Sequence, residues 1–457
     1  MHSTVIQRVA AAIGILLLAL LLPGCGHRAE APPNIIVITL DTFRADRMQA
    51  YGGTGLAPTL DALAAEGTVF KHAVSAAGTT YPSHATMFTG LYPRQHAVRS
   101  NYSRLPDDIP TVAEQLKGAG YDSGAFVSFK GMVVHGNLGK GFDAVSDTKV
   151  GEEPFRDGKE TARLALDWLD SRGPSENPVF LWYHNFDVHL PLRVTDYSRE
   201  KLGEIPYEGP WSDGASIEEV TTIQSEILAS ETLQKAIRAL YDGEVRLMDQ
   251  AVKYLLDGLK DRGILDNAVL VVVADHGEAL GEHHWFGHGA TLWETVIKVP
   301  LVVVDFRKPE HHLVDTTVGT VDLATTLLQL AGAEPLASPG RSLVPALRGE
   351  ALEPAEYVAE IEVRKEDDRP SWYDVDHLAI YYEGFKLERL FGKTALYDLT
   401  RDPDAANPLK PGNLNAETIA AYLEDRAVDY LANGRMANTA ELDKTAVDQL
   451  RSLGYVQ

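Results

Sequence analysis

The segment from Thr79 to Gly90 contains the strongest candidate for a nucleophile. Its Thr80 lies two residues before Pro82, and proline suits the first turn of a helix, where its missing N–H costs nothing. Gly90 is suited to end that helix. Thr80 would then lie at a helix N-terminus, where free N–H groups and the helix dipole favour an anion. A hydroxyl aimed at a bound anion is a candidate nucleophile; the structural alternative is an ordinary helix cap.

Two predicted strands end in groups that bind metals. The apolar run Asn34–Leu40 is typical of a strand buried on both faces, and Asp41 follows it directly. The run Ala268–Val273 leads to Asp275 and His276. Open α/β sheets bind their ligands at these C-terminal strand ends, so we expect the groups to meet in one site. Each residue also has a structural alternative, such as an aspartate that only caps the next helix.

A set of carboxylates and imidazole suits a divalent cation, and the imidazole favours zinc, manganese or iron over calcium. Such a cation would lower the pKa of the Thr80 hydroxyl, as it does for bound water. His189, which follows a third predicted strand at Val179–Tyr183, and His288 would protonate the leaving group or hold the substrate's oxygens, unless they are ligands. We therefore expect one or two divalent ions: zinc, manganese or calcium.

Strands that alternate with helices predict an α/β fold with a doubly wound, mostly parallel sheet flanked by helices. A long helix over about 233–259 has an apolar stripe that we expect to be core packing only. Short, partly alternating strands after about residue 351 predict a smaller antiparallel sheet. The predicted domains are a catalytic domain at 34–350 and a C-terminal α+β subdomain at 351–457, with a soft boundary because only Gly349 and Pro354 break the chain nearby.

Residues 1–25 are typical of a bacterial lipoprotein signal peptide. Arg8 precedes the apolar run Val9–Leu22, which is short for a membrane span and right for a signal sequence. The run leads to Cys25, the only cysteine, which would carry the lipid. The alternative is an ordinary secretory signal with a chance cysteine. Residues 26–33 would form a tether, so we expect a lipid-anchored protein of the bacterial cell envelope that faces the periplasm or the exterior.

The composition excludes some partners and chemistries. Lys and Arg number 42 against 65 Asp and Glu, which gives a formal net charge of −23, and the sequence has no basic run. Nucleic acid is therefore not an expected partner. A single cysteine also excludes an intrachain disulfide and a cysteine-based zinc cluster.

Over nearly the whole chain after the signal peptide, these segments resemble the sulfatase family, within the alkaline phosphatase superfamily. The family's opening strand and aspartate match residues 34–41, and its Cys/Ser-x-Pro-Ser-Arg signature matches Thr80–His84. Its Asp-Pro-His-x-Pro turn resembles Asp187–Pro191, and its metal-binding Asp-Asn/His-Gly-Glu with a later His or Lys matches Asp275–Glu278 and His288. The resemblance implies a sulfatase fold, catalytic positions at Thr80, His84, His189 and His288, and metal-binding positions at Asp41, Asp275 and His276.

The departures from the family bear on the chemistry. Sulfatases convert a Cys or Ser at the nucleophile position to formylglycine, and Thr80 is not a precursor of that aldehyde. His84 stands where the signature has Arg, and Thr42 where the first loop has a second metal-binding Asp. A sulfothreonine lacks the elimination route of formylglycine hydrate. A phosphothreonine is a workable intermediate, and threonine is the nucleophile in phosphodiesterases and lipid-headgroup phosphotransferases of this superfamily.

We therefore expect a metal-dependent hydrolase of anionic esters that transfers a phosphoryl group, or less favourably a sulfuryl group, to Thr80. The substrate would be a small-molecule, glycan or lipid ester. One alternative is a true sulfatase that works without formylglycine. The others are a lipid-headgroup phosphotransferase, disfavoured because those relatives usually carry several membrane spans, and a catalytically inactive binding lipoprotein.

Overall fold

The computed structural model describes residues 31–433, apart from 102, 130–131, 147–154, 206–208, 212, 363–375, 391, 411 and 413. The chain from Pro33 onward forms one compact unit. The predicted signal peptide with Cys25, and residues 26–30 of the predicted tether, lie outside the described residues. Among the helices that are described, none is both long enough and apolar enough to cross a membrane.

A nine-stranded sheet forms the centre of this unit, in the order β10-β2-β9-β6-β1-β5-β3-β4, with β11 paired to β2. The central strand β1 is parallel to both of its neighbours, β5 and β6. Among the described strands of this sheet, only β9 is antiparallel to its neighbours, β2 and β6. The predicted mostly parallel sheet is confirmed. The strands are β1 Asn34–Leu40, β2 Thr68–Val74, β3 Asp122–Val127, β4 Ala144–Ser146, β5 Val179–Asn185, β6 Ala268–Ala274, β9 Lys298–Asp305, β10 His312–Val314 and β11 Val318–Gly319.

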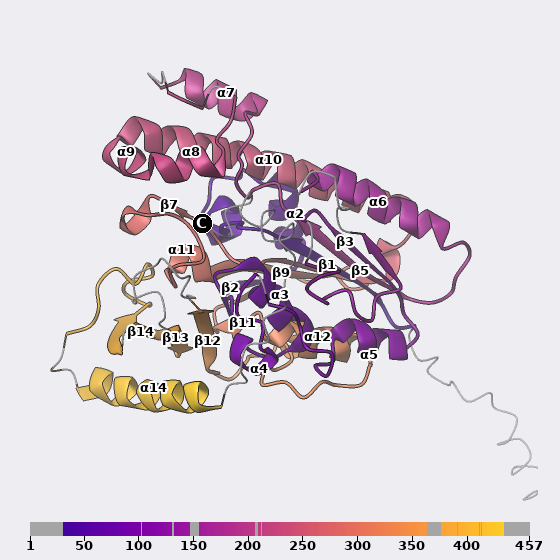
Figure 1. Cartoon of the computed structure of the whole chain (residues 1–457). Coiled ribbons are helices and arrows are strands. Elements are labelled where there is room, and N and C mark those ends of the chain that lie inside the picture. Colours follow the sequence, from indigo (N-terminus) through magenta and orange to yellow (C-terminus); the bar gives the residue numbers. More distant parts are fainter. Residues whose placement is uncertain are drawn as a thin grey trace, which may run out of the picture. The chain divides into compact units, whose positions relative to one another are not determined.

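Helices cover both faces of the sheet (Figure 1). The longest, α10, buries the stripe that includes Ile237, Tyr241, Val245 and Met248, as its helical spacing predicts. On that face lie α2 Pro58–Glu66, α6 Gly158–Ser171 and α10 Glu231–Asp261. On the other face lie α3 Thr80–Thr89, α5 Val112–Gly118 and α12 Asp322–Ala331.

A polar excursion of the chain between β5 and α10 packs against α10 through the helices α7 and α9. Its helices are short, and α8 begins with a capping box in which Ser216 and Glu219 satisfy each other's backbone N–H groups. The excursion contains α7 Asp196–Gly203, α8 Ile217–Thr222 and α9 Gln224–Ala229. The remaining short elements are α4 Pro93–His96, the hairpin strands β7 Ala279–Leu280 and β8 Phe286–Gly287, α11 Glu294–Ile297 and α13 Val344–Leu347.

The predicted small C-terminal sheet is also present, as an antiparallel meander in the order β12-β13-β14-β15. Its fully buried Lys386 donates from Nζ to the Leu292 carbonyl at 2.5 Å and pairs with Glu294 at 3.1 Å, so this sheet is tied to the segment after His288. The predicted domain boundary at 350/351 stays a prediction. The elements are β12 Tyr357–Glu362, β13 Asp376–Tyr382, β14 Phe385–Leu390, β15 Lys393–Asp398 and α14 Leu414–Ala432.

Four strands of the central sheet are absent from the sequence-based prediction: the two- or three-residue strands β4, β10 and β11, and the longer strand β2. The β2 segment, Thr68–Val74, has Lys71 and His72 in the middle of its apolar residues, which interrupts a strand pattern. The structure accommodates them with an irregularity in the pairing with β9 between Phe70 and Ala73. At this bulge His72 is exposed and Lys71 is half-buried, with its ammonium group bonded to the Ala50 carbonyl, while the apolar residues on either side stay buried.

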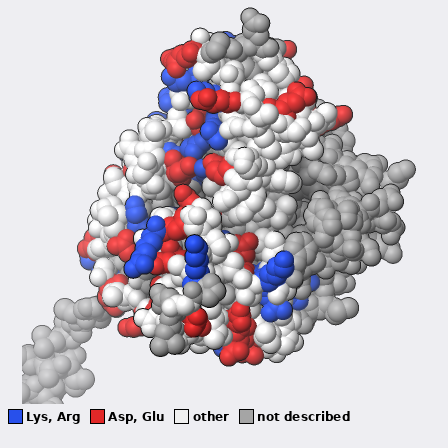
Figure 2. All heavy atoms as spheres, turned by 90° about the vertical axis from the view of Figure 1, so that its left-hand side faces the viewer, with Lys and Arg blue, Asp and Glu red and all other residues white. Residues whose placement is uncertain are grey.

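The surface charge is distributed rather than concentrated on the face that carries α9 and β14. Figure 2 shows acidic and basic side chains interspersed there. Exposed ion pairs of the described chain include Lys201 with Glu204 at 2.7 Å and Lys235 with Glu231 at 2.7 Å. Exposed pairs of this kind contribute little to stability, at most about 1 kcal/mol each.

Candidate active site

The C-terminal ends of β1, β5 and β6 bring their polar residues to one edge of the sheet. Leu40 of β1 pairs with Asn185 of β5 and with Ala274 of β6. The backbone ladder continues one residue further, because Asp41 N donates to the Asn185 carbonyl and Asp275 N donates to the Leu40 carbonyl. Asp41 and Asp275 therefore lie on adjacent strand ends, as the sequence predicts, and both are fully buried.

Thr80 is the first residue of α3, and its hydroxyl points at these strand ends. Thr80 Oγ1 lies 3.4 Å from Asp41 Oδ2 and 3.4 Å from His276 Nε2. Ser83, one turn later in α3, donates its hydroxyl to the Asp275 carbonyl at 2.7 Å, which holds the helix N-terminus to the loop after β6. Gly90 ends the helix in a left-handed conformation, as predicted. The nucleophile candidate and the metal-ligand candidates thus occupy one buried site.

Three atoms of this site could bind a divalent cation. One oxygen of each carboxylate, Asp41 Oδ1 and Asp275 Oδ2, is buried without a hydrogen-bond partner among the described residues. His276 Nδ1 lies 2.9 Å from the Gly277 carbonyl, and because a carbonyl only accepts, this nitrogen carries the hydrogen. The lone pair of the neutral ring is then on Nε2, which faces Asp275 Oδ2 at 3.5 Å.

The ligand atoms of Asp41, Asp275 and His276 all lie within 4.8 Å of one another. Burial raises the pKa of Asp41 to about 7, and burial together with the neighbouring Asp41 raises the pKa of Asp275 well above its ordinary value. Two buried carboxylates with unpartnered oxygens and little compensating charge fit a divalent cation. The structure thus brings together the two carboxylates and the imidazole that the sequence analysis singled out, and their role as ligands stays a prediction.

Thr42, at the position where the family resemblance implies a second aspartate, has a strained backbone. Its φ is 51°, which is rare for a β-branched residue. Thr42 N donates to Asp275 Oδ1 at 3.3 Å, and the hydroxyl of Tyr241 in α10 donates to the Thr42 carbonyl at 2.8 Å. Tyr241 therefore fixes the loop after β1, so the apolar stripe of α10 does more than the core packing expected from the sequence.

His189 and His288 lie beside the cluster. The ring centroids of His276 and His288 are 4.4 Å apart, and those of His189 and His288 are 5.1 Å apart. His288 Nδ1 lies 3.2 Å from both carboxylate oxygens of Glu278. Burial opposes the protonation of His288, but the Glu278 charge and hydrogen bond outweigh it and raise the pKa. His189 donates from Nδ1 to the Leu190 carbonyl at 2.6 Å, and burial lowers its pKa well below the ordinary value.

His84 lies one turn behind the nucleophile candidate. Its Nδ1 donates to the Thr80 carbonyl at 2.8 Å and lies 3.7 Å from Asp275 Oδ2. Burial lowers the pKa of His84 well below its ordinary value, so the ring is neutral. Its Nε2 is buried without a hydrogen-bond partner among the described residues. A neutral imidazole thus stands where the sequence comparison expects an arginine.

The structure brings together Thr80, His84, His189, His288, Asp41, Asp275 and His276, and it adds residues that the sequence analysis leaves out of the site. His184, in the last part of β5, has its Nε2 3.4 Å from Asp41 Oδ2. Glu278 is the partner of His288. His184 directly follows the predicted strand Val179–Tyr183, and Glu278 lies in the loop after the predicted strand Ala268–Val273, so their positions could have been noticed in the sequence. That His184 faces Asp41 and Glu278 faces His288 is visible only in the three-dimensional structure.

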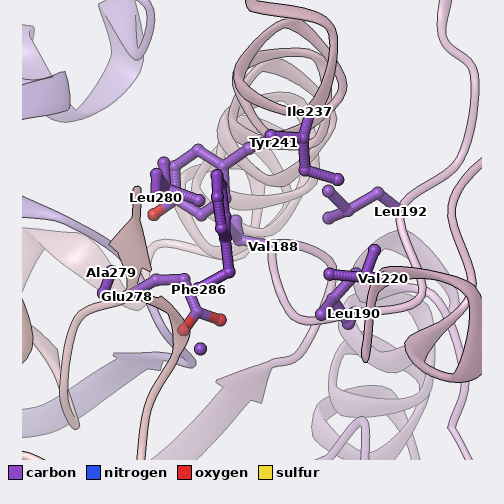
Figure 3. Close-up of a pocket in the computed structure, with 11 residues that line it drawn as sticks. Val188, Leu190, Leu192, Val220, Ile237, Tyr241, Glu278, Ala279, Leu280 and Phe286 are labelled. Carbon is purple, nitrogen blue, oxygen red and sulfur yellow. The ribbon is translucent and has the colours of Figure 1, made fainter. Parts of the chain in front are cut away.

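A small apolar cavity borders the site. Its free volume is about 20 Å³, slightly more than one water molecule needs. Figure 3 shows Leu190, Leu192 and Val220 on one side and Leu280 and Phe286 on the other, with the Glu278 carboxylate at the edge. The excursion, α10 and the β7–β8 hairpin line this cavity, which is too small to admit a sugar or an aryl ring without movement of these side chains.

Comparisons with known proteins agree with this geometry. The sequence model of the sulfatase family matches residues 33–333. The chain is 25% identical to the Δ4,5-hexuronate-2-O-sulfatase of Bacteroides thetaiotaomicron, over 92% of each chain. It is 24% identical to PehA of Trinickia caryophylli, a multifunctional alkaline phosphatase superfamily protein, over 69% of this chain and 77% of that protein.

A solved structure shows the same fold. The phosphonate monoester hydrolase of Agrobacterium radiobacter superposes with a TM-score of 0.67 at 20% identity, covering 88% of this chain and 95% of that one. The predicted family and fold are therefore confirmed. Because the family's sequence model spans more than half of the 457 residues, the chain belongs to the sulfatase family and is an ester hydrolase.

Proposed function

We propose that the protein is a metal-dependent hydrolase of phosphate or phosphonate esters that uses Thr80 as its nucleophile. The observation that carries the proposal is the position of Thr80 Oγ1, 3.4 Å from Asp41 Oδ2 and 3.4 Å from His276 Nε2, at the N-terminus of α3. The cation-binding atoms would be Asp41 Oδ1, Asp275 Oδ2 and His276 Nε2. A divalent cation bound there supplies charge that favours the alkoxide of Thr80 and attracts a nonbridging oxygen of the ester.

In the first step Thr80 Oγ1 attacks phosphorus, the bond between phosphorus and the leaving oxygen breaks, and the hydroxyl proton passes toward Asp41 Oδ2. The leaving oxygen takes a proton from His288 Nε2, whose ring is held by Glu278. In the second step water attacks phosphorus in line, gives a proton to His288 Nε2, and the bond to Thr80 Oγ1 breaks. Thr80 Oγ1 takes back its proton from Asp41 Oδ2, so both residues return to their starting states. His84, hydrogen-bonded to the Thr80 carbonyl, holds the first turn of α3 in place.

The second candidate is a sulfate ester hydrolase. It is favoured by family membership and by the similarity to a hexuronate-2-O-sulfatase. A threonine nucleophile counts against it, because a sulfothreonine cannot eliminate sulfate as a formylglycine hydrate does and must be attacked at sulfur. The choice between the two ester classes therefore depends on the side chain at position 80.

A substrate panel separates the two candidates. The purified protein would be assayed with aryl phosphate monoesters, phosphate diesters, phosphonate esters and sulfates, each with Zn²⁺, Mn²⁺ and Ca²⁺. We expect kcat/KM for the best phosphorus ester to exceed that for the sulfate by at least about tenfold, or about 1.4 kcal/mol of transition-state stabilisation. Rapid acid quench and peptide mass spectrometry should find the phosphoryl group on Thr80. A higher kcat/KM for the sulfate would assign the protein to the second candidate.

We further propose that the protein is a lipoprotein of the bacterial cell envelope, anchored through Cys25. The proposal is supported by the apolar run Val9–Leu22 and by the position of the only cysteine at its end. Replacing Cys25 with serine should move the protein from the membrane fraction to the soluble fraction of the producing bacterium and leave kcat/KM unchanged. A Cys25→Ser variant that stays in the membrane fraction would contradict the lipid anchor.

A further inference from the structure

A row of buried polar contacts runs from the core of the sheet to Asp41: two hydrogen bonds, followed by a close approach of His184 to the carboxylate. The indole Nε1 of Trp182 lies 2.9 Å from Thr39 Oγ1, and Thr39 Oγ1 lies 2.9 Å from His184 Nδ1. His184 Nε2 lies 3.4 Å from Asp41 Oδ2. Thr39 and His184 are paired residues of the parallel strands β1 and β5, and all four side chains are fully buried. The row therefore excludes water and has a fixed geometry.

The direction of the row follows from what each group can donate. An indole N–H only donates, so Thr39 Oγ1 accepts from Trp182. The Thr39 hydroxyl has its own proton to donate, and the acceptor in reach among the described residues is His184 Nδ1. With Nδ1 accepting from the Thr39 hydroxyl, the neutral imidazole carries its hydrogen on Nε2. The N–H of His184 thus faces Asp41 Oδ2.

In this arrangement the two carboxylate oxygens of Asp41 have different neighbours. Oδ2 faces His184 and the Thr80 hydroxyl, while Oδ1 has no hydrogen-bond partner among the described residues and lies 4.0 Å from His276 Nε2. Without the His184 donor, the carboxylate could rotate about its last bond and exchange the two oxygens. A fixed rotation keeps Oδ1 toward the cation and Oδ2 toward the hydroxyl that must lose its proton.

We propose that His184 is a positioning residue for Asp41: its Nε2–H holds Oδ2, and Thr39 and Trp182 fix the tautomer that makes this possible. The inference rests on the proposed cation site and adds the residues that orient one of its ligands. Partners of ligating groups commonly contribute about 10–100-fold to metal affinity, which sets the size of the expected effect.

The test measures cation affinity by competition with a chelator, together with kcat and KM. His184→Leu removes the donor and should weaken the affinity for Zn²⁺ or Mn²⁺ by about 10–100-fold. Thr39→Val removes the group that sets the tautomer and should weaken the affinity in the same direction, but less. His184→Gln can present an amide N–H toward Oδ2 and should recover most of the affinity. A merely structural role would not predict recovery by glutamine.

His96 offers a matched control, because it is also a fully buried histidine that bonds to a threonine, Thr86, at 3.1 Å. His96→Leu should leave the cation affinity of the folded protein unchanged. Wild-type affinity in both His184→Leu and Thr39→Val would overturn the inference while leaving the cation site intact. Equal losses in His184→Leu and His184→Gln would make His184 a ligand instead. A wild-type protein that binds no divalent cation would overturn the proposed function as well.

Discussion

Replacing Thr80 with alanine is expected to lower kcat/KM on the best phosphorus ester by about 10⁴-fold or more, as losses of nucleophiles do in other enzymes. The reason is geometric: the fold places Thr80 Oγ1 3.4 Å from both Asp41 Oδ2 and His276 Nε2. The proposed cation-binding atoms do not include Thr80 Oγ1, so the cation content of the variant should equal that of the wild type. Activity and cation content would be measured on the same preparation.

Two other substitutions at the same position make this test sharper. Thr80→Ser keeps the hydroxyl and loses one methyl group, so it should retain activity at a cost in stability of about 1 kcal/mol. Thr80→Cys introduces the residue that the family converts to formylglycine, and it should shift the preference toward sulfate esters if the producing cell performs that conversion. Mass spectrometry of the peptide would establish which side chain is present. Full activity in Thr80→Ala would remove Thr80 from the mechanism.

The strand ends explain why much of the site could be predicted from the sequence. A continuous apolar run such as Ala268–Val273 is buried on both faces, and a polar residue directly after it must lie at the C-terminal edge of the sheet. Asp41 and Asp275 satisfy this rule on adjacent strands. Thr80 follows a similar local rule, since Pro82 and Gly90 mark the two ends of α3.

Contacts between distant segments could not be predicted in the same way. The partnership of Thr39 with His184 depends on the register of β1 against β5, across 145 residues of sequence. The bond from Tyr241 to Thr42 joins α10 to the loop after β1, and a helical stripe of apolar residues gives no sign of it. The β2 strand was missed because Lys71 and His72 interrupt its pattern, and only the bulge opposite β9 makes room for them.

Replacing Asp275 with asparagine is expected to have two effects of opposite sign on stability. Burial and the neighbouring Asp41 raise the pKa of Asp275, so the ionised carboxylate lowers the stability of the cation-free folded protein at pH values above the ordinary pKa. A neutral amide of the same shape removes that cost and can still accept from Thr42 N and His276 N through its oxygen. The melting temperature of the cation-free variant should therefore equal or exceed that of the cation-free wild type.

With cation added, the wild type should have a higher melting temperature than the Asp275→Asn variant. A ligand at about 100 times its Kd stabilises a protein by about 2.7 kcal/mol, and the wild type should gain this while the Asp275→Asn variant gains little, because the amide nitrogen is not a ligand. Thermal unfolding with and without Zn²⁺, Mn²⁺ or Ca²⁺ measures both effects. Asp322 is a matched control, since it is also buried and its raised pKa is about 6, but it bonds to Tyr357 away from the cluster. Asp322→Asn should keep the full gain on adding cation, and an equal gain in Asp275→Asn would show that the cation binds elsewhere.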